Sequence, residues 1–137
     1  MFITAPRVAV VDASATIDTL LGIEPWQERM ESLIRDDVML FAPSGFPLEV
    51  ATGLLVGQRR SPAEVRAHLR RVESLEIELS DLASERIAEC IGLAARHHLT
   101  VYDAAYLHLA LELDAELVTG DRAMARAARA EGLVVHD

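Results

Sequence analysis

The chain has 137 residues, of which 51% are hydrophobic, so it is long enough to form one domain around a buried core. A single cysteine excludes an internal disulfide, no apolar stretch approaches the length of a membrane span, and the N-terminus lacks the long hydrophobic segment of a secretory signal. The formal net charge of −9 excludes nucleic-acid binding that relies on overall positive charge. We therefore expect a single domain over residues 1–137 that resides in the cytoplasm.

Strand-like and helix-like segments alternate through the first half of the chain. The run from Arg7 to Val11 is apolar after its first residue and rich in valine, which predicts a buried central strand that delivers Asp12 to its carboxyl end. A second apolar strand is predicted at residues 38–42, where Pro43 ends it. Helices are predicted at residues 13–21, 25–34, 47–56 and 62–72.

The same alternation continues to the end of the chain. The predicted elements are a strand at residues 76–79, an amphipathic helix at 81–97, a helix at 104–113 that residues 100–103 open, a strand at 115–119 and a helix at 122–129. Gly120 makes the turn before the last helix, and Asp121 can cap that helix. Repeated alternation of strand and helix predicts an α/β fold, a three-layer α/β/α sandwich with right-handed crossovers.

Acidic residues stand at four of the predicted element junctions. Two of them follow strands, and two lie where helices begin. Because sites in open α/β sheets form in the crevice beyond the carboxyl ends of the strands, we expect one polar site built from Asp12, Glu49, Asp103 and Asp121. An acid in a first helical turn also complements the helix dipole, which is the structural alternative for Asp103 taken alone.

Four sequence blocks, in order, resemble one known family. They are V-V-D-A-S-A near the start, P-x-x-x-x-x-E-V from Pro43 to Val50, Y-D-A-A-Y-L-x-L-A from Tyr102, and L-V-T-G-D-R from Leu117. The chain resembles the PIN domain, specifically the VapC-type toxin ribonucleases of type II toxin-antitoxin systems, from Val8 to about Val135. The family often has Asn after the glutamate and its Val-Ala, where this chain has Thr52 and Gly53.

This resemblance implies both a fold and a function. The implied fold has a central, mainly parallel five-stranded sheet. The implied function is a metal-dependent endoribonuclease that cleaves RNA phosphodiester bonds as the toxin of a toxin-antitoxin pair. The implied partners are RNA, a cognate antitoxin whose C-terminal segment covers the acidic groove, and a second copy of the chain in a homodimer.

Clustered carboxylates suit hard divalent cations. Mg²⁺, or Mn²⁺ in its place, prefers oxygen ligands, and without a cation the clustered carboxylates would repel one another. We assign Asp12, Asp103 and Asp121 as metal ligands, and Glu49 as a ligand or as the group that positions the attacking water. A metal of this kind activates water for attack on a phosphodiester and stabilises the leaving oxygen.

Three further residues are candidates for supporting roles. Ser14 and Thr119 lie close in sequence to two of the acids and could orient them by hydrogen bonds, although ordinary cap or turn hydroxyls are an equal alternative. Arg122 directly follows Asp121, and we favour it for substrate binding. A solvated surface role is favoured for the other arginines considered, which are Arg59, Arg60, Arg66, Arg70, Arg71, Arg126 and Arg129.

Three other functions are alternatives to a ribonuclease. A phosphorylatable receiver domain needs a lysine near its last strands, and this chain contains no lysine. A phosphatase of the haloacid dehalogenase type needs an acid two residues after Asp12, where Ser14 stands. A catalytically inactive PIN-like module that binds nucleic acid or protein remains open, because only an assay separates it from an active enzyme.

Overall fold

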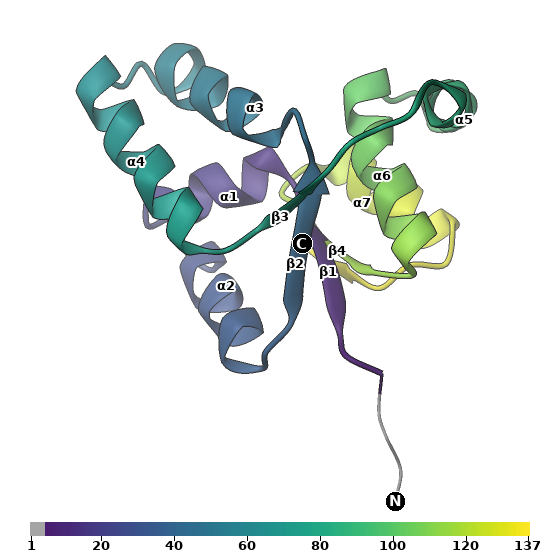
Figure 1. Cartoon of the computed structure of the whole chain (residues 1–137), viewed down its shortest axis with the longest axis horizontal. Coiled ribbons are helices and arrows are strands. Elements are labelled where there is room, and N and C mark those ends of the chain that lie inside the picture. The colour runs from purple at the N-terminus through teal and green to yellow at the C-terminus, as the bar shows by residue number, and fades with distance from the viewer. Residues whose placement is uncertain (1–4) are drawn as a thin grey trace, which may run out of the picture.

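The computed structural model describes residues 5–137 and has a central sheet with helices on both faces (Figure 1). The strand order is β3-β2-β1-β4-β5, and every neighbouring pair is parallel. The strands are β1 (Val8–Val11), β2 (Met39–Pro43), β3 (Glu78–Ser80), β4 (Glu116–Val118) and β5 (Val135–His136). The predicted five-stranded parallel sheet is therefore confirmed.

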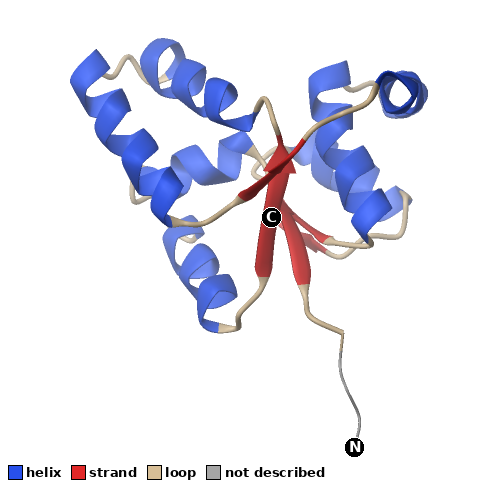
Figure 2. Ribbon diagram, in the orientation of Figure 1, coloured by secondary structure: helices blue, strands red, loops and turns tan. Residues whose placement is uncertain are grey.

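Helices form the two outer layers. Figure 1 shows α1 to α4 on one side of the sheet and α5 to α7 on the other, and Figure 2 separates the red strands from the blue helices. The helices are α1 (Ala13–Leu20), α2 (Trp26–Arg35), α3 (Phe46–Thr52), α4 (Pro62–Ser74), α5 (Ser84–His97), α6 (Val101–Leu113) and α7 (Arg122–Ala130), with a π-helical turn η1 (Gly53–Gly57) after α3. The predicted three-layer sandwich is confirmed.

The centre of the core is β1. Ala9, Val10 and Val11 are fully buried, because β1 lies between β2 and β4 and both of its faces are covered by helices. Val11 lies beside Val118 in the parallel register, so these two strands end at the same edge of the sheet. The residues that follow them, Asp12 and Thr119, are therefore brought together.

Some predicted boundaries differ from the structure. The helix predicted at residues 47–56 is two segments, α3 and η1, because the second half forms π-helical hydrogen bonds. A Cβ atom at Gly53 would collide with the Ile17 side chain of α1, so the absence of a side chain lets η1 pack closely against α1. Pro43 was predicted to follow β2, but it is the last residue of that strand. It pairs with Ser80 of β3.

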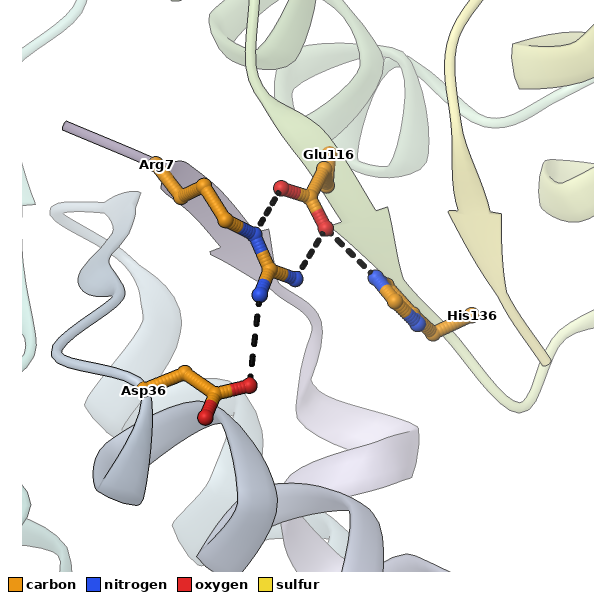
Figure 3. Close-up of polar contacts among 4 residues, drawn as sticks. All are labelled: Arg7, Asp36, Glu116 and His136. Atoms are coloured by element: carbon orange, nitrogen blue, oxygen red, sulfur yellow. Dashed lines mark hydrogen bonds and ion pairs between the residues drawn. The ribbon is translucent and has the colours of Figure 1, made fainter. Parts of the chain in front are cut away.

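A charged network joins the strands at the end of the sheet that is remote from the four acids (Figure 3). Arg7 Nε and Nη2 donate to the two carboxylate oxygens of Glu116 at 2.9 and 2.8 Å, and Arg7 also pairs with Asp36. His136 of β5 lies 2.7 Å from the same Glu116 carboxylate. The network connects the start of β1, the start of β4, the short β5 and the end of α2.

Within residues 5–137, no helix has the length and apolar composition that crossing a membrane requires.

Candidate active site

Asp12 is a buried carboxylate held by three donors. It is the N-cap of α1, and its Oδ1 accepts hydrogen bonds from the Ala15 N–H and the Ser14 hydroxyl, both at 2.9 Å. Its Oδ2 accepts a hydrogen bond from the hydroxyl of Thr119, which follows β4. Burial nevertheless raises the pKa of Asp12 to about 6, because these donors only partly replace water, and the Asp121 charge adds to the rise.

Asp121 stands beside Asp12 at the end of β4. Its Oδ1 caps α7 by accepting from the Ala123 and Met124 N–H groups at 2.8 and 3.1 Å, as predicted for this residue. Its own N–H donates to the Thr119 hydroxyl oxygen at 3.0 Å. Thr119 therefore fixes both acids at once.

Glu49 approaches from α3 and is held by Tyr106 of α6. The Tyr106 hydroxyl donates to Glu49 Oε2, which leaves Oε1 without a hydrogen bond among the described residues. Burial raises the pKa of Glu49, and the Asp103 charge adds to that rise. Burial likewise raises the pKa of Tyr106, reinforced by the Glu49, Asp12 and Asp103 charges, so its hydroxyl stays protonated and remains a donor.

Asp103 occupies the third position of α6, beside the Thr100 hydroxyl that begins the helix. Its N–H donates to the Thr100 hydroxyl at 3.0 Å, which caps the helix. Burial raises the pKa of Asp103, and the Asp121 charge contributes. Asp121 therefore acts on both Asp12 and Asp103, and Asp103 acts on Glu49. These couplings connect the four acids in a chain from Asp12 through Asp121 and Asp103 to Glu49.

The donor set fits a hard divalent cation by its chemistry. All four groups are carboxylates, three have a raised pKa, and no basic side chain is among the groups that shift them. As the side chains stand, however, no three Asp, Glu, His or Cys residues in the described part of the chain converge closely enough to hold an ion. Metal binding therefore requires side-chain rotation, for which Asp103 and the unpaired oxygens of Glu49 and Asp121 are available.

The supporting residues divide into two groups. The predicted hydrogen bonds of Ser14 and Thr119 are present, and both go to Asp12, while the Gly120 N–H donates to Ser14 at 3.1 Å. Arg122 is exposed at the first position of α7 and makes no ion pair among the described residues. Its guanidinium is thus available to a ligand at this rim.

Two residues of the site carried no predicted role. Tyr106 lies three positions after Asp103 on α6, a spacing that places both on one helical face. Asp18 lies four positions after Ser14 on α1, and its carboxylate borders Gly120. Burial raises the pKa of Asp18. Helical spacing from a predicted site residue was the available signal in both cases.

Comparison with known proteins identifies the family. The PIN domain model matches residues 9–130. The chain belongs to the PIN domain family. A PIN domain relative, Ribonuclease VapC1 of Mycobacterium tuberculosis, is 33% identical over 121 residues, which are 86% of this chain and 89% of that protein.

Solved structures share the PIN domain fold. VapBC2 from Rickettsia felis, solved bound to a DNA fragment from its promoter, superposes with a TM-score of 0.70 at 14% identity, covering 95% of this chain and 98% of that one. PAE2754 from Pyrobaculum aerophilum gives a TM-score of 0.67 at 23% identity, with coverage of 94% and 83%. FitAcB from Neisseria gonorrhoeae gives 0.59 at 21% identity, with coverage of 94% and 96%.

Proposed function

We propose that this PIN domain is a metal-dependent endoribonuclease that cleaves RNA phosphodiester bonds as the toxin of a toxin-antitoxin pair. The observation that carries the proposal is the gathering of four acids at one rim of the sheet, where Thr119 bonds both Asp12 and Asp121 and the charge of Asp121 reaches Asp103, whose charge reaches Glu49. Four clustered carboxylates cost stability without a cation, and their chemistry is that of a site for Mg²⁺ or Mn²⁺. The 33% identity to a protein named Ribonuclease VapC1 supports the substrate class.

Each acid has a role that follows from its restraint. Asp12 and Asp121, fixed by Thr119 and by helix N-termini, form the rigid part of the metal-binding set, and Asp103 completes it. A bound divalent ion supplies Lewis acidity, which activates water and stabilises a leaving oxygen. Glu49, held by Tyr106, binds the ion or orients the attacking water through its free Oε1.

Arg122 serves the substrate in this proposal. The N-terminus of α7 and the adjacent guanidinium offer positive charge next to Asp121, in a chain whose net charge is −9. A phosphate of the RNA contacts Arg122 while the cleaved phosphate lies at the metal site. Local charge thus compensates for the repulsion between an acidic protein and RNA.

The partner proposal follows from family resemblance. An open metal-dependent ribonuclease endangers its own cell, so we expect a cognate antitoxin that inserts an arginine among the four carboxylates. Changing that arginine to alanine should relieve inhibition even if the two chains still associate. Complete inhibition by the alanine variant would mean that the antitoxin blocks RNA entry by bulk alone. The homodimer and residence in the cytoplasm stay predictions.

Cleavage of single-stranded RNA tests the proposed activity. The purified wild-type protein should cut the RNA with Mg²⁺ or Mn²⁺ and lose that activity in excess chelator. Asp12→Asn should remove most of the activity, whereas Asp81→Asn, which changes an exposed acid outside the set, should not. Cleavage that persists undiminished in chelator would refute the metal mechanism, and a protein that binds RNA without cutting it would be the inactive binding module.

A further inference from the structure

A shallow, open apolar cleft borders Glu49, one of the four acids. It has a volume of about 410 Å³ and is lined by Leu48, Glu49, Thr52, Gly53 and Tyr102. Leu48 and Tyr102 are 75% and 76% exposed, the two highest values among the exposed large apolar residues of the described chain, and both line this one cleft. In Figure 1 the helices that carry them, α3 and α6, lie on opposite sides of the carboxyl end of β2.

Each of the two exposed side chains is the sequence neighbour of one of the acids. Leu48 immediately precedes Glu49 on α3, and Tyr102 immediately precedes Asp103 on α6. Of the two acids, Glu49 lines the cleft together with Leu48 and Tyr102. A ligand that has a charged group at the acids and a flat apolar group next to it would meet both.

A single-stranded nucleic acid is such a ligand. A divalent ion held by the acids would bind its phosphate, and the attached base is a flat ring with a π-face that stacks on aromatic side chains. The acidic net charge of −9 makes stacking more important here, because general phosphate attraction contributes little to affinity.

We infer that the Leu48–Tyr102 cleft binds a nucleobase of single-stranded RNA, stacked on the Tyr102 ring and next to the phosphate that a divalent ion held by the acids would bind. Tyr102 is then a binding residue that sets where the strand lies relative to the acids. The cleft contacts the π-face of the base, so it accepts any base. This inference rests on the proposed function for its choice of RNA as the ligand.

Equilibrium binding measurements distinguish the contribution of the bases to affinity from that of the sugar-phosphate backbone. All proteins carry Asp12→Asn, so that the RNA is not consumed, and Mg²⁺ is present at a concentration high enough to offset the weaker metal binding expected of this variant. The probes are a fluorescent ten-nucleotide oligouridylate and the same oligonucleotide without its bases, and the readout is the ratio of their two Kd values. We expect the base-free oligonucleotide to bind at least about ten-fold more weakly.

Adding Tyr102→Ala should bring the ratio of the two Kd values close to one. Adding Tyr102→Phe should leave the ratio unchanged, because the phenylalanine ring still stacks. Val56→Ala is the matched control, since Val56 is an exposed apolar residue of η1 that does not line the cleft. Equal melting temperatures confirm that each variant is folded, and the exposure of Tyr102 makes a folding defect unexpected.

Each outcome decides the inference. A ratio that Tyr102→Ala leaves unchanged, or no measurable binding of the intact RNA, overturns it. A Tyr102→Ala change that weakens antitoxin binding but not RNA binding makes the cleft a protein contact and also overturns it. If the Tyr102-dependent ratio is found but the wild-type protein cuts no RNA with Mg²⁺ or Mn²⁺, the inference stands and the proposed enzymatic function fails.

Discussion

The Thr119 hydroxyl donates a hydrogen bond to Asp12, although 107 positions separate the two residues along the chain. The contact exists because β1 and β4 are parallel neighbours that end at the same edge of the sheet. Thr119 also accepts a hydrogen bond from the Asp121 N–H, so one hydroxyl connects two acids of the site. The geometry of the acids therefore depends on the pairing of β1 with β4.

Thr119→Val should shift the pH dependence of activity. The Thr119 hydrogen bond lowers the pKa of Asp12, so its loss should raise that pKa above its present value of about 6. The acidic limb of the pH–rate profile should move to higher pH, and the protein should lose about 1–3 kcal/mol of stability because buried polar groups lose their partner. Thr119→Ser should restore the wild-type profile. An unchanged acidic limb in Thr119→Val would show that Asp12 does not control it.

Asp12→Asn should leave the metal-free protein as stable as the wild type, or make it more stable. The pKa of Asp12 is raised from 3.8 to about 6 on folding, so its ionisation costs stability as pH rises through that window. At pH 7 the full cost is present, on the order of 3 kcal/mol, and the asparagine removes it while disturbing hydrogen bonds worth about 1 kcal/mol each.

Urea unfolding at pH 3.5 and pH 7 without metal measures this difference. The advantage of Asp12→Asn should be present at pH 7 and absent at pH 3.5. Asp103→Asn should behave in the same direction, because burial and the Asp121 charge also raise the pKa of Asp103. A variant that is clearly less stable than the wild type at pH 7 would show that the carboxylates do not destabilise the metal-free fold.

Tyr106→Phe should weaken activity without removing the fold. The ring is retained, but Glu49 loses the hydroxyl that holds its Oε2. Because that hydrogen bond lowers the pKa of Glu49, the pKa should rise and the pH optimum should move upward. We expect kcat to fall by about ten-fold or more, in the range usual for loss of an oriented acid-base group. An unchanged kcat would mean that Glu49 needs no support from Tyr106.

Glu116→Gln should make the free energy of unfolding less dependent on pH in the acidic range. Arg7 holds the pKa of Glu116 at about 2, below its ordinary value of 4.5, and His136 contributes. The carboxylate therefore stabilises the fold above about pH 4.5, and this contribution is lost as pH falls toward 2. Unfolding curves of the wild type and Glu116→Gln should differ at pH 7 and converge near pH 2. The exposed Glu31→Gln is the control, and a Glu116→Gln difference that persists at pH 2 would contradict the account.

Sequence patterns predicted most of the architecture because they record burial. The valines of β1 identify it as a central strand, and the junction acids lie where the strand ends and helix starts place them. β5 was not located, since Val135 and His136 form a two-residue strand with no periodicity to recognise. Its position instead depends on tertiary contacts, such as the one between His136 and Glu116.

The contacts within the site were less predictable from the sequence than the identities of its residues. The Tyr106–Glu49 contact joins residues that are 57 positions apart on two different helices, and no local pattern reports it. The π-helical η1 was also missed, because its close packing on Ile17 depends on tertiary approach at Gly53. Residue type and position predicted which acids gather, whereas the hydrogen bonds that orient them required the fold.

Binding of Mn²⁺ tests the central claim that Asp12, Asp103 and Asp121 form one metal site, and the Glu49 variant shows whether Glu49 is a further ligand or acts only on the attacking water. The metal's electron paramagnetic resonance signal gives its Kd at pH 7 for the wild type, for Asp12→Asn, Glu49→Gln, Asp103→Asn and Asp121→Asn, and for the control Asp81→Asn. We predict stoichiometric binding to the wild type and the control, and at least about ten-fold weaker binding when any one of the ligands Asp12, Asp103 or Asp121 is changed. Wild-type affinity in all three of those variants would contradict the claim and place the metal elsewhere.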